Sequence, residues 1–314
     1  MASKKSSTHQ SLAILLFFLL TLSSAHAKGG IAVYWGQNNG DGTLTATCDT
    51  GNYEIVLLAF LYTFGCGRTP DWNFAGHCGP WSPCDKLEPE IKHCQQKGVK
   101  VFLSLGGAVG PYSLCSPEDA RNVSDYLYNN FLSGQRGPLG SVSLDGIDFD
   151  IEGGTNLYWD NLARELDTRR QRGRYFYLSA APQCFFTDYY LDTAIRTWLF
   201  DYIFVQFYNN PPCQYNINTG DTSQLIASWN QWTSYVKLNN TVFMGLPAAP
   251  DAAPSGGYIP PTDLCSRVLP IIKLTPNYGG VMLWDRFRDV NSGFSNQIKD
   301  CVKVNGDVDG VSQM

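Results

Sequence analysis

The sequence predicts a single (β/α)₈ barrel, an α/β fold in which parallel strands alternate with helices. Short apolar runs, many of them β-branched, recur eight times and are separated by turns and helix-like stretches. The runs are nearly continuous in apolar residues, as expected for a parallel sheet covered on both faces. Eight such units fit the roughly 250 residues that this barrel needs. A doubly wound open sheet is the alternative.

The expected strands follow the eight apolar runs, at 30–35, 54–60, 99–105, 145–152, 175–180, 202–207, 241–246 and 280–284. The stretch after the second run has an apolar face at Ile91 and Cys94, and the next stretch starts with Pro117 after Ser116, a favourable helix start. The expected helices are 88–97, 117–131, 157–170, 191–199, 223–236, 262–273 and 292–302.

The first 27 residues have the pattern of a secretory signal peptide. Lys4 and Lys5 precede an apolar run at 12–20, and Ala25 and Ala27 supply the small residues of a cleavage site. The run is too short to span a bilayer, although an uncleaved anchor is the alternative. We therefore expect one domain at 28–314 in a secreted protein, with no membrane partner. By position alone, the polar residues 305–314 are a candidate vacuolar sorting tail.

Charge and cysteine content exclude several other classes. Lys and Arg number 23 against 28 Asp and Glu, a net charge of −5, which does not suit a nucleic-acid partner. All ten cysteines follow residue 27, and an even number in an exported chain indicates disulfides. There is no CxxC pair, and His77 and His93 are the only histidines after residue 27, so we expect no metal site.

The most informative segment is DGIDFDIE at 145–152, because it carries three alternate acids. Alternate residues of a strand share a face, so Asp148, Asp150 and Glu152 point one way and the apolar residues between them point the other way. The apolar set must face the helices, which places the carboxylates inside the barrel. Crowded, poorly solvated carboxylates share protons and raise a pKa, as general acid catalysis requires.

Other hydrolase and nucleotide-binding classes fit less well. No histidine follows His93 to serve a Ser-His-Asp triad, and no GK dipeptide is present for a phosphate-binding loop. Carboxylates without histidine indicate glycoside hydrolysis.

The octapeptide resembles the DxxDxDxE motif of the family 18 glycoside hydrolases, and the chain is similar to the plant class III chitinases over nearly its whole length after residue 27. The stretches IAVYWGQNNGDGTL, AGHC, VFLSLGG, SAAPQC, VQFYNNPPCQY, GLPAAPDAA and GGVMLW match in order. The resemblance implies a (β/α)₈ barrel and a secreted or vacuolar endochitinase that defends against fungi. It implies chitin and chitooligosaccharides as substrates, no cofactor and a monomer, and it leaves lysozyme activity open.

The resemblance also implies roles for individual residues. Glu152 is the acid that protonates the glycosidic oxygen, and Asp150, with Asp148 as its inner partner, steadies the acetamido group of the substrate. Tyr208 donates a hydrogen bond to that group, whose own oxygen is the nucleophile, an exception to the usual two-carboxylate scheme. Six further residues are candidates for the sugar-binding cleft: Tyr34, Gln37, Phe60, Asn73, Gln206 and Trp284.

Three disulfides of the family match this chain by position, namely Cys48–Cys94, Cys78–Cys84 and Cys184–Cys213. The other four cysteines are extra, and position alone suggests the pairs Cys66–Cys115 and Cys265–Cys301.

Some members of the family are lectins, storage proteins or inhibitors of other glycosidases, and these functions are the alternatives. The presence of Glu152 favours hydrolysis. Three residues in loops that follow strands depart from the family pattern and could narrow the cleft: Tyr62, Ala108 and Phe185.

Overall fold

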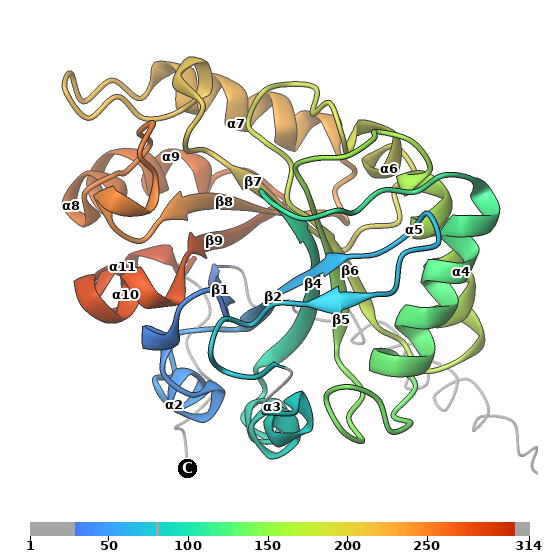
Figure 1. Ribbon diagram of the computed structural model, residues 1–314. Helices are drawn as coiled ribbons and strands as arrows, with labels where there is room; N and C mark the ends of the chain where they lie inside the picture. The colour runs from blue at the N-terminus through green and yellow to red at the C-terminus, as the bar shows by residue number, and fades with distance from the viewer. Residues whose placement is uncertain (1–28, 80–81, 305–314) are drawn as a thin grey trace, which may run out of the picture.

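Eight apolar runs of the chain form parallel strands that close into a barrel, which confirms the predicted fold class (Figure 1). The computed structural model describes residues 29–79 and 82–304, so the expected signal peptide and the tail at 305–314 lie outside the described residues. The barrel strands are β1 (Gly30–Trp35), β2 (Ile55–Thr63), β4 (Lys100–Gly107), β5 (Gly146–Ile151), β6 (Tyr177–Ala180), β7 (Tyr202–Gln206), β8 (Thr241–Pro247) and β9 (Tyr278–Trp284).

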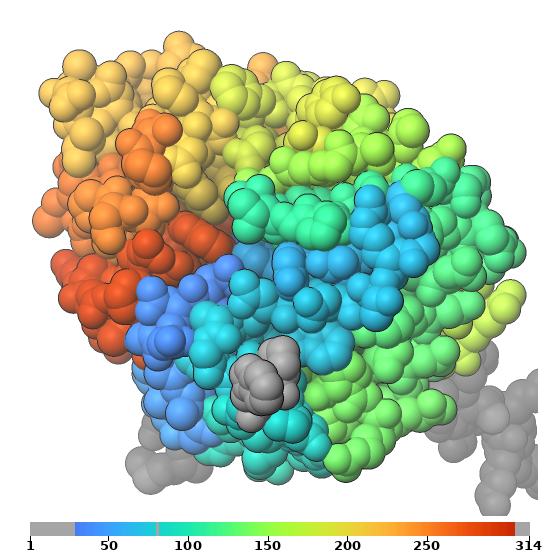
Figure 2. Space-filling view, viewed as in Figure 1, coloured from blue at the N-terminus to red at the C-terminus, as the bar shows by residue number. Residues whose placement is uncertain are grey.

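The two ends of the chain close the barrel. Strand β1 pairs in parallel with β2 on one side and with β9 on the other, where Gly30 stands beside Gly280. In the space-filling view, the blue N-terminal and red C-terminal segments accordingly meet at the surface (Figure 2). The short strand β3 (Asp71–Trp72) adds an antiparallel partner to β2 beyond the barrel.

Each barrel strand has one face toward the barrel interior and one toward the helices. Ile147, Phe149 and Ile151 of β5 belong to the large core between strands and helices. A second, smaller core inside the barrel includes Tyr34 and Phe60. The chain therefore divides the residues of β5 as its alternation predicts, with the apolar set outside and the acids inside.

The helices lie around the strands (Figure 1). Helix α4 begins as predicted, because the Ser116 hydroxyl accepts a hydrogen bond from the Asp119 amide and Pro117 needs no partner for an N–H. The helices are α2 (Leu44–Asp49), α3 (Glu88–Gln96), α4 (Pro117–Leu127), α5 (Trp159–Arg172), α6 (Asp192–Ile195), α7 (Ser223–Tyr235), α8 (Pro261–Asp263), α9 (Leu269–Ile272), α10 (Arg286–Ser292) and α11 (Phe294–Val302).

Several helices differ from the expected ranges. The helix expected at 292–302 is α11 alone, because Gly293 takes a left-handed conformation that ends α10. The helix expected at 262–273 is interrupted by a π-helical turn before α9, where Pro270 lacks an amide proton. Helix α6 is shorter than expected, and α2, β3 and α10 were not predicted.

The ten cysteines form five disulfides, Cys48–Cys94, Cys66–Cys115, Cys78–Cys84, Cys184–Cys213 and Cys265–Cys301. These are the three pairs implied by the resemblance and the two suggested by position. No helix within the described ranges is both long and apolar enough to cross a membrane.

Candidate active site

Strand β5 carries a row of carboxylates into the barrel. Asp148 is fully buried, Asp150 is 3% exposed, and Glu152 is half-buried directly after the strand. Gly106 of β4 pairs with Asp150, and its positive φ of 99° and missing Cβ let the two strands approach. Burial thus decreases along the row, and Glu152 is the acid with the best access to a bound molecule.

Asp148 is held by three hydroxyl groups. Ser104 and Ser179 stand beside it on the neighbouring strands β4 and β6, and donate hydrogen bonds of 2.7 and 2.6 Å. The Tyr34 hydroxyl donates a third, of 2.9 Å. Burial raises the pKa of Asp148, and these three hydrogen bonds act against that rise by stabilising the carboxylate. Asp148 is therefore a fixed acceptor with its oxygens already occupied.

Asp150 and Glu152 form a pair that shares a hydrogen bond. Burial is the main cause that raises the pKa of Asp150 well above its ordinary value, and the charges of Glu152 and Asp148 raise it further. Burial also raises the pKa of Glu152. The Gln206 amide of β7 donates to Asp150 at 2.9 Å and to Glu152 at 3.3 Å. The two carboxyl groups therefore share a proton, and they retain it at a higher pH than an ordinary carboxyl group would.

Tyr208 lies just beyond the end of β7 and is 6% exposed. Burial raises the pKa of its phenol, and the nearby charges of Asp150 and Glu152 raise it further, so the hydroxyl stays protonated. Within residues 29–79 and 82–304, this hydroxyl makes no hydrogen bond. It is therefore a donor available to a ligand beside the carboxylate pair.

Three aromatic rings lie next to this row. Trp284, at the end of β9, stacks on Phe60 with ring centres 6.1 Å apart and meets the edge of Tyr34 at 5.6 Å. Trp284 is half-buried, whereas Tyr34 and Phe60 are buried. The half-exposed indole can offer an apolar face to a sugar ring.

Gln37 and Asn73 join the loops beside Phe60. The Gln37 amide donates to the carbonyls of Ala59 and Asn73, and the Asn73 backbone pairs with that of Phe60. The Asn73 side chain accepts from the Ala75 amide and is exposed. Through these contacts, Gln37 holds the backbone next to Phe60 in place, whereas the Asn73 side chain lies at the protein surface.

Two of the three residues that depart from the family pattern lie in loops, as expected: Ala108 is exposed, and Phe185 is 45% exposed. The third, Tyr62, was wrongly placed in a loop, because β2 extends to Thr63, and its hydroxyl donates to Asp71.

Sequence reasoning missed four residues around the carboxylates. Ser104 and Ser179 are single polar residues inside apolar strands, and aligning the strands in register with Asp148 would have found them. The hydroxyl of Tyr112 accepts a hydrogen bond from the Glu152 amide at 3.0 Å. The carboxylate of Asp188 accepts three backbone hydrogen bonds, and its charge raises the pKa of Glu152. Tyr112 and Asp188 lie in loops with no periodic signal.

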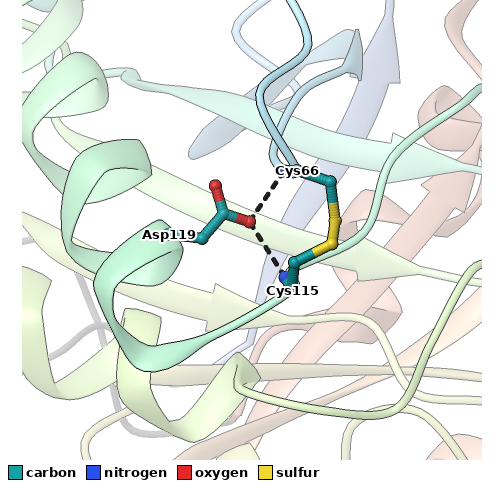
Figure 3. A group of neighbouring side chains, drawn as sticks. All are labelled: Cys66, Cys115 and Asp119. Carbon is teal, nitrogen blue, oxygen red and sulfur yellow. Dashed lines mark hydrogen bonds between the residues drawn. A yellow bond between two sulfur atoms is a disulfide. The ribbon is translucent and has the colours of Figure 1, made fainter.

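In the described ranges, one group of metal-ligand residue types gathers in space, formed by Cys66, Cys115 and Asp119 (Figure 3). The two sulfur atoms are bonded to each other, and Asp119 accepts hydrogen bonds from both cysteine amides, of 2.7 and 2.9 Å. A disulfide offers no thiolate to a metal, so these residues form a loop clamp rather than a metal site.

The chain is similar to known proteins over most of its length. Residues 30–253 match the glycosyl hydrolases of family 18. An acidic endochitinase of Vitis vinifera is 54% identical over 297 residues, which cover 93% of this chain and 97% of that protein. The ICChI chitinase of Ipomoea carnea superposes with a TM-score of 0.82 at 51% identity, covering 87% of this chain and all of that one. A xylanase and α-amylase inhibitor protein of Scadoxus multiflorus superposes with a TM-score of 0.80 at 46% identity, covering 86% of this chain and 97% of that one.

Proposed function

Because the chain belongs to the glycosyl hydrolases of family 18, we propose that it is an endochitinase that cuts β-1,4 bonds within polymers of N-acetylglucosamine. The observation that carries the proposal is the hydrogen-bonded pair of Asp150 and Glu152, which is most accessible at Glu152. The row of acids to which the pair belongs lies next to Tyr34, whose ring contacts Trp284. An inhibitor that acts by docking on another enzyme has no use for such a pair.

Glu152 acts as the general acid in this proposal. Burial raises the pKa of Glu152, so its carboxyl keeps its proton to a higher pH than an ordinary glutamic acid, and its half-buried position lets the proton reach the glycosidic oxygen. As the bond between the anomeric carbon and that oxygen breaks, the proton passes to the leaving sugar, and Glu152 becomes a carboxylate. Glu152 then takes a proton from the water that completes the reaction.

The nucleophile comes from the substrate. Asp150 and Glu152 lie two residues apart at the end of β5, roughly 7 Å along the chain, so both approach the same side of the scissile bond. Asp148 and Asp188 are each occupied by three hydrogen bonds. The acetamido oxygen of the sugar therefore attacks the anomeric carbon and forms a cyclic oxazolinium ion, which water opens from the vacated side.

Asp150 and Tyr208 hold the acetamido group during this step. When the shared proton lies on Glu152, the Asp150 carboxylate can accept the acetamido N–H and balance the positive charge that develops on the ring. The free Tyr208 hydroxyl can donate to the same group and fix its orientation.

We further propose that the protein is secreted, since an apolar run with a cleavage pattern precedes residue 28. We also propose that it is a monomer, as the resemblance to the plant class III chitinases implies.

Product stereochemistry tests the proposal. The recombinant chain from residue 28 is incubated with a soluble chitin oligomer, a cellulose oligomer and fully deacetylated chitosan, and proton NMR follows the first product. We expect the β-anomer from the chitin oligomer and no turnover of the other two, which lack an acetamido oxygen. An initial α-anomer, or comparable cleavage of cellulose, would overturn the mechanism, and no turnover of any substrate would overturn the proposed function.

A further inference from the structure

The hydrogen-bond ladder between β4 and β5 is interrupted at the position of Glu152. Gly107 pairs with Ile151 at the end of the ladder. In a regular parallel ladder, the amide of the next residue, Glu152, would donate to the Gly107 carbonyl. Instead, the Tyr112 hydroxyl donates to the Gly107 carbonyl at 2.6 Å and accepts from the Glu152 amide at 3.0 Å. One side-chain hydroxyl thus replaces the last rung and sets the separation of the two strand ends.

The Tyr112 ring has little freedom to move. It is 3% exposed, it stacks on Phe64 with ring centres 5.6 Å apart and an angle of 8°, and Trp159 packs against it in a T-shaped arrangement. The backbone of Tyr112 also pairs with that of Phe64, so the loop after β4 follows the end of β2.

A covalent clamp holds the same two loops just beyond this contact. The disulfide Cys66–Cys115 joins them, and the Asp119 carboxylate binds the amides of both cysteines (Figure 3). Arg68 adds hydrogen bonds to the Gly65 carbonyl and the Ser113 hydroxyl. Each of these contacts fixes a residue next to, or within three positions of, Phe64 or Tyr112.

We propose that Tyr112 is a positioning residue for the general acid Glu152, and that the Cys66–Cys115 clamp holds Tyr112 in place. The inference rests on the proposed function, because it concerns the position of the Glu152 carboxyl relative to the glycosidic oxygen. Tyr112 fixes the Glu152 backbone at its amide and leaves the carboxyl free for the substrate. A displacement of a catalytic group by about 1 Å can reduce a reaction rate on the order of 100-fold.

Tyr112→Phe tests the first half, because it keeps the stacked ring and removes only the hydroxyl. We expect kcat on a soluble chitin oligomer to fall roughly 10- to 100-fold, with KM within about twofold of the wild type. Tyr278→Phe is the matched control, since its buried hydroxyl makes one hydrogen bond, to the Val302 carbonyl at the opposite end of β9 from Trp284. A kcat within twofold of the wild type for Tyr112→Phe, or a change carried by KM alone, would overturn the proposal.

The double variant Cys66→Ser/Cys115→Ser tests the clamp, with Cys265→Ser/Cys301→Ser as the control pair. We expect the first double variant to lower kcat several-fold without raising KM, and the control pair to leave kcat unchanged. Adding Tyr112→Phe to the first double variant should cost less than it costs in the wild type, because both changes release the same contact. Fully additive losses would show that the clamp does not act through Tyr112.

Amide hydrogen exchange separates this inference from the proposed function. In the protein without substrate, the Glu152 amide should exchange at least tenfold faster in Tyr112→Phe than in the wild type or Tyr278→Phe. Unchanged exchange would overturn the positioning role even for an active enzyme. If the wild type turned over no chitin oligomer, the proposed function would fail. The role of Tyr112 in positioning a general acid would then fail with it.

Discussion

The carboxylates of β5 differ in role because their neighbours differ. Asp148 receives three hydroxyl hydrogen bonds, whereas Asp150 receives an amide and faces a second carboxyl. The same residue type, two positions apart, is therefore a fixed acceptor in one place and a proton carrier in the other. Glu152 is the most exposed of the three, which suits proton delivery.

Replacing Glu152 by Gln should abolish most hydrolysis without unfolding the chain. The amide has nearly the same shape but no acidic proton, so kcat should fall roughly 10²- to 10⁴-fold. Steady-state kinetics on a chitin oligomer and the melting temperature measure the two effects. Glu118→Gln on the exposed surface of α4 is the control. A variant that kept most of its kcat would remove Glu152 from the role of acid.

Asp150→Asn should change how stability depends on pH. Burial and neighbouring charge raise the pKa of Asp150, so the folded protein keeps a proton that the unfolded chain releases above pH about 4. The stability that Asp150 contributes is complete below that pH and is lost as pH rises toward the folded-state pKa. The asparagine does not titrate and can donate to Glu152 as the protonated acid does.

The free energy of unfolding of Asp150→Asn, relative to the wild type, should therefore increase from pH 4 to pH 8, by at most about 1.4 kcal/mol per pH unit. Chemical denaturation at several pH values measures this difference. Asp300→Asn, at an exposed position of α11, is the control. A difference that stayed constant or declined with pH would contradict the direction given for Asp150.

The row of acids could be predicted from the sequence because a strand has a period of two. The hydroxyls of Ser104 and Ser179 around Asp148 could not, since they come from strands β4 and β6, and their approach depends on a register that local patterns do not reveal. Tyr112 was missed for a similar reason, because its contact with Glu152 joins residues 40 positions apart through an irregular loop.

At the scale of elements, helices α10 and α11 meet at one buried carboxylate. Asp289 of α10 accepts hydrogen bonds from the Ser295 amide and hydroxyl of α11, each 2.6 Å long. It also accepts from the Tyr53 hydroxyl, just before β2, and pairs with Arg286 at 3.4 Å. This cluster attaches α10 and α11 to the segment that leads into β2.

Asp289→Ala should therefore lower the free energy of unfolding by roughly 3–5 kcal/mol, because Arg286 and the Ser295 amide lose a buried partner. Urea denaturation measures the change. Asp300→Ala, exposed on α11, should change it by less than about 0.5 kcal/mol. A loss for Asp289→Ala no greater than that of the control would show that the cluster adds nothing to stability.

The element boundaries show where sequence patterns stop being informative. The eight strands are confirmed because burial on both faces leaves a continuous apolar run that turns interrupt. The predicted helix boundaries were less exact. Gly293 ends α10 and Pro270 lacks an amide proton, and both lie within stretches whose pattern is otherwise helical. Helix α2, at Leu44–Asp49, is too short to show a periodic face.

For the whole molecule, five disulfides connect loops and helices around the barrel. We expect thiol titration of the purified chain under denaturing, non-reducing conditions to find no reactive thiol. After reduction, the same assay should find ten, and the melting temperature should fall, since loss of a native disulfide typically costs about 2–5 kcal/mol. Two or more thiols before reduction would show that at least one pair is absent in solution.

The pairing of β1 with β9 has a consequence for how the protein is made. Gly30 cannot find Gly280 until nearly the whole chain has left the ribosome, and contacts so distant in sequence form slowly. Trp284 meets Tyr34 only through that closure, so the aromatic surface beside the acids is completed after synthesis rather than during it. A nascent chain therefore contains the proton donor Glu152 long before it has a complete surface for binding a sugar. A chain truncated before β9 never forms that surface.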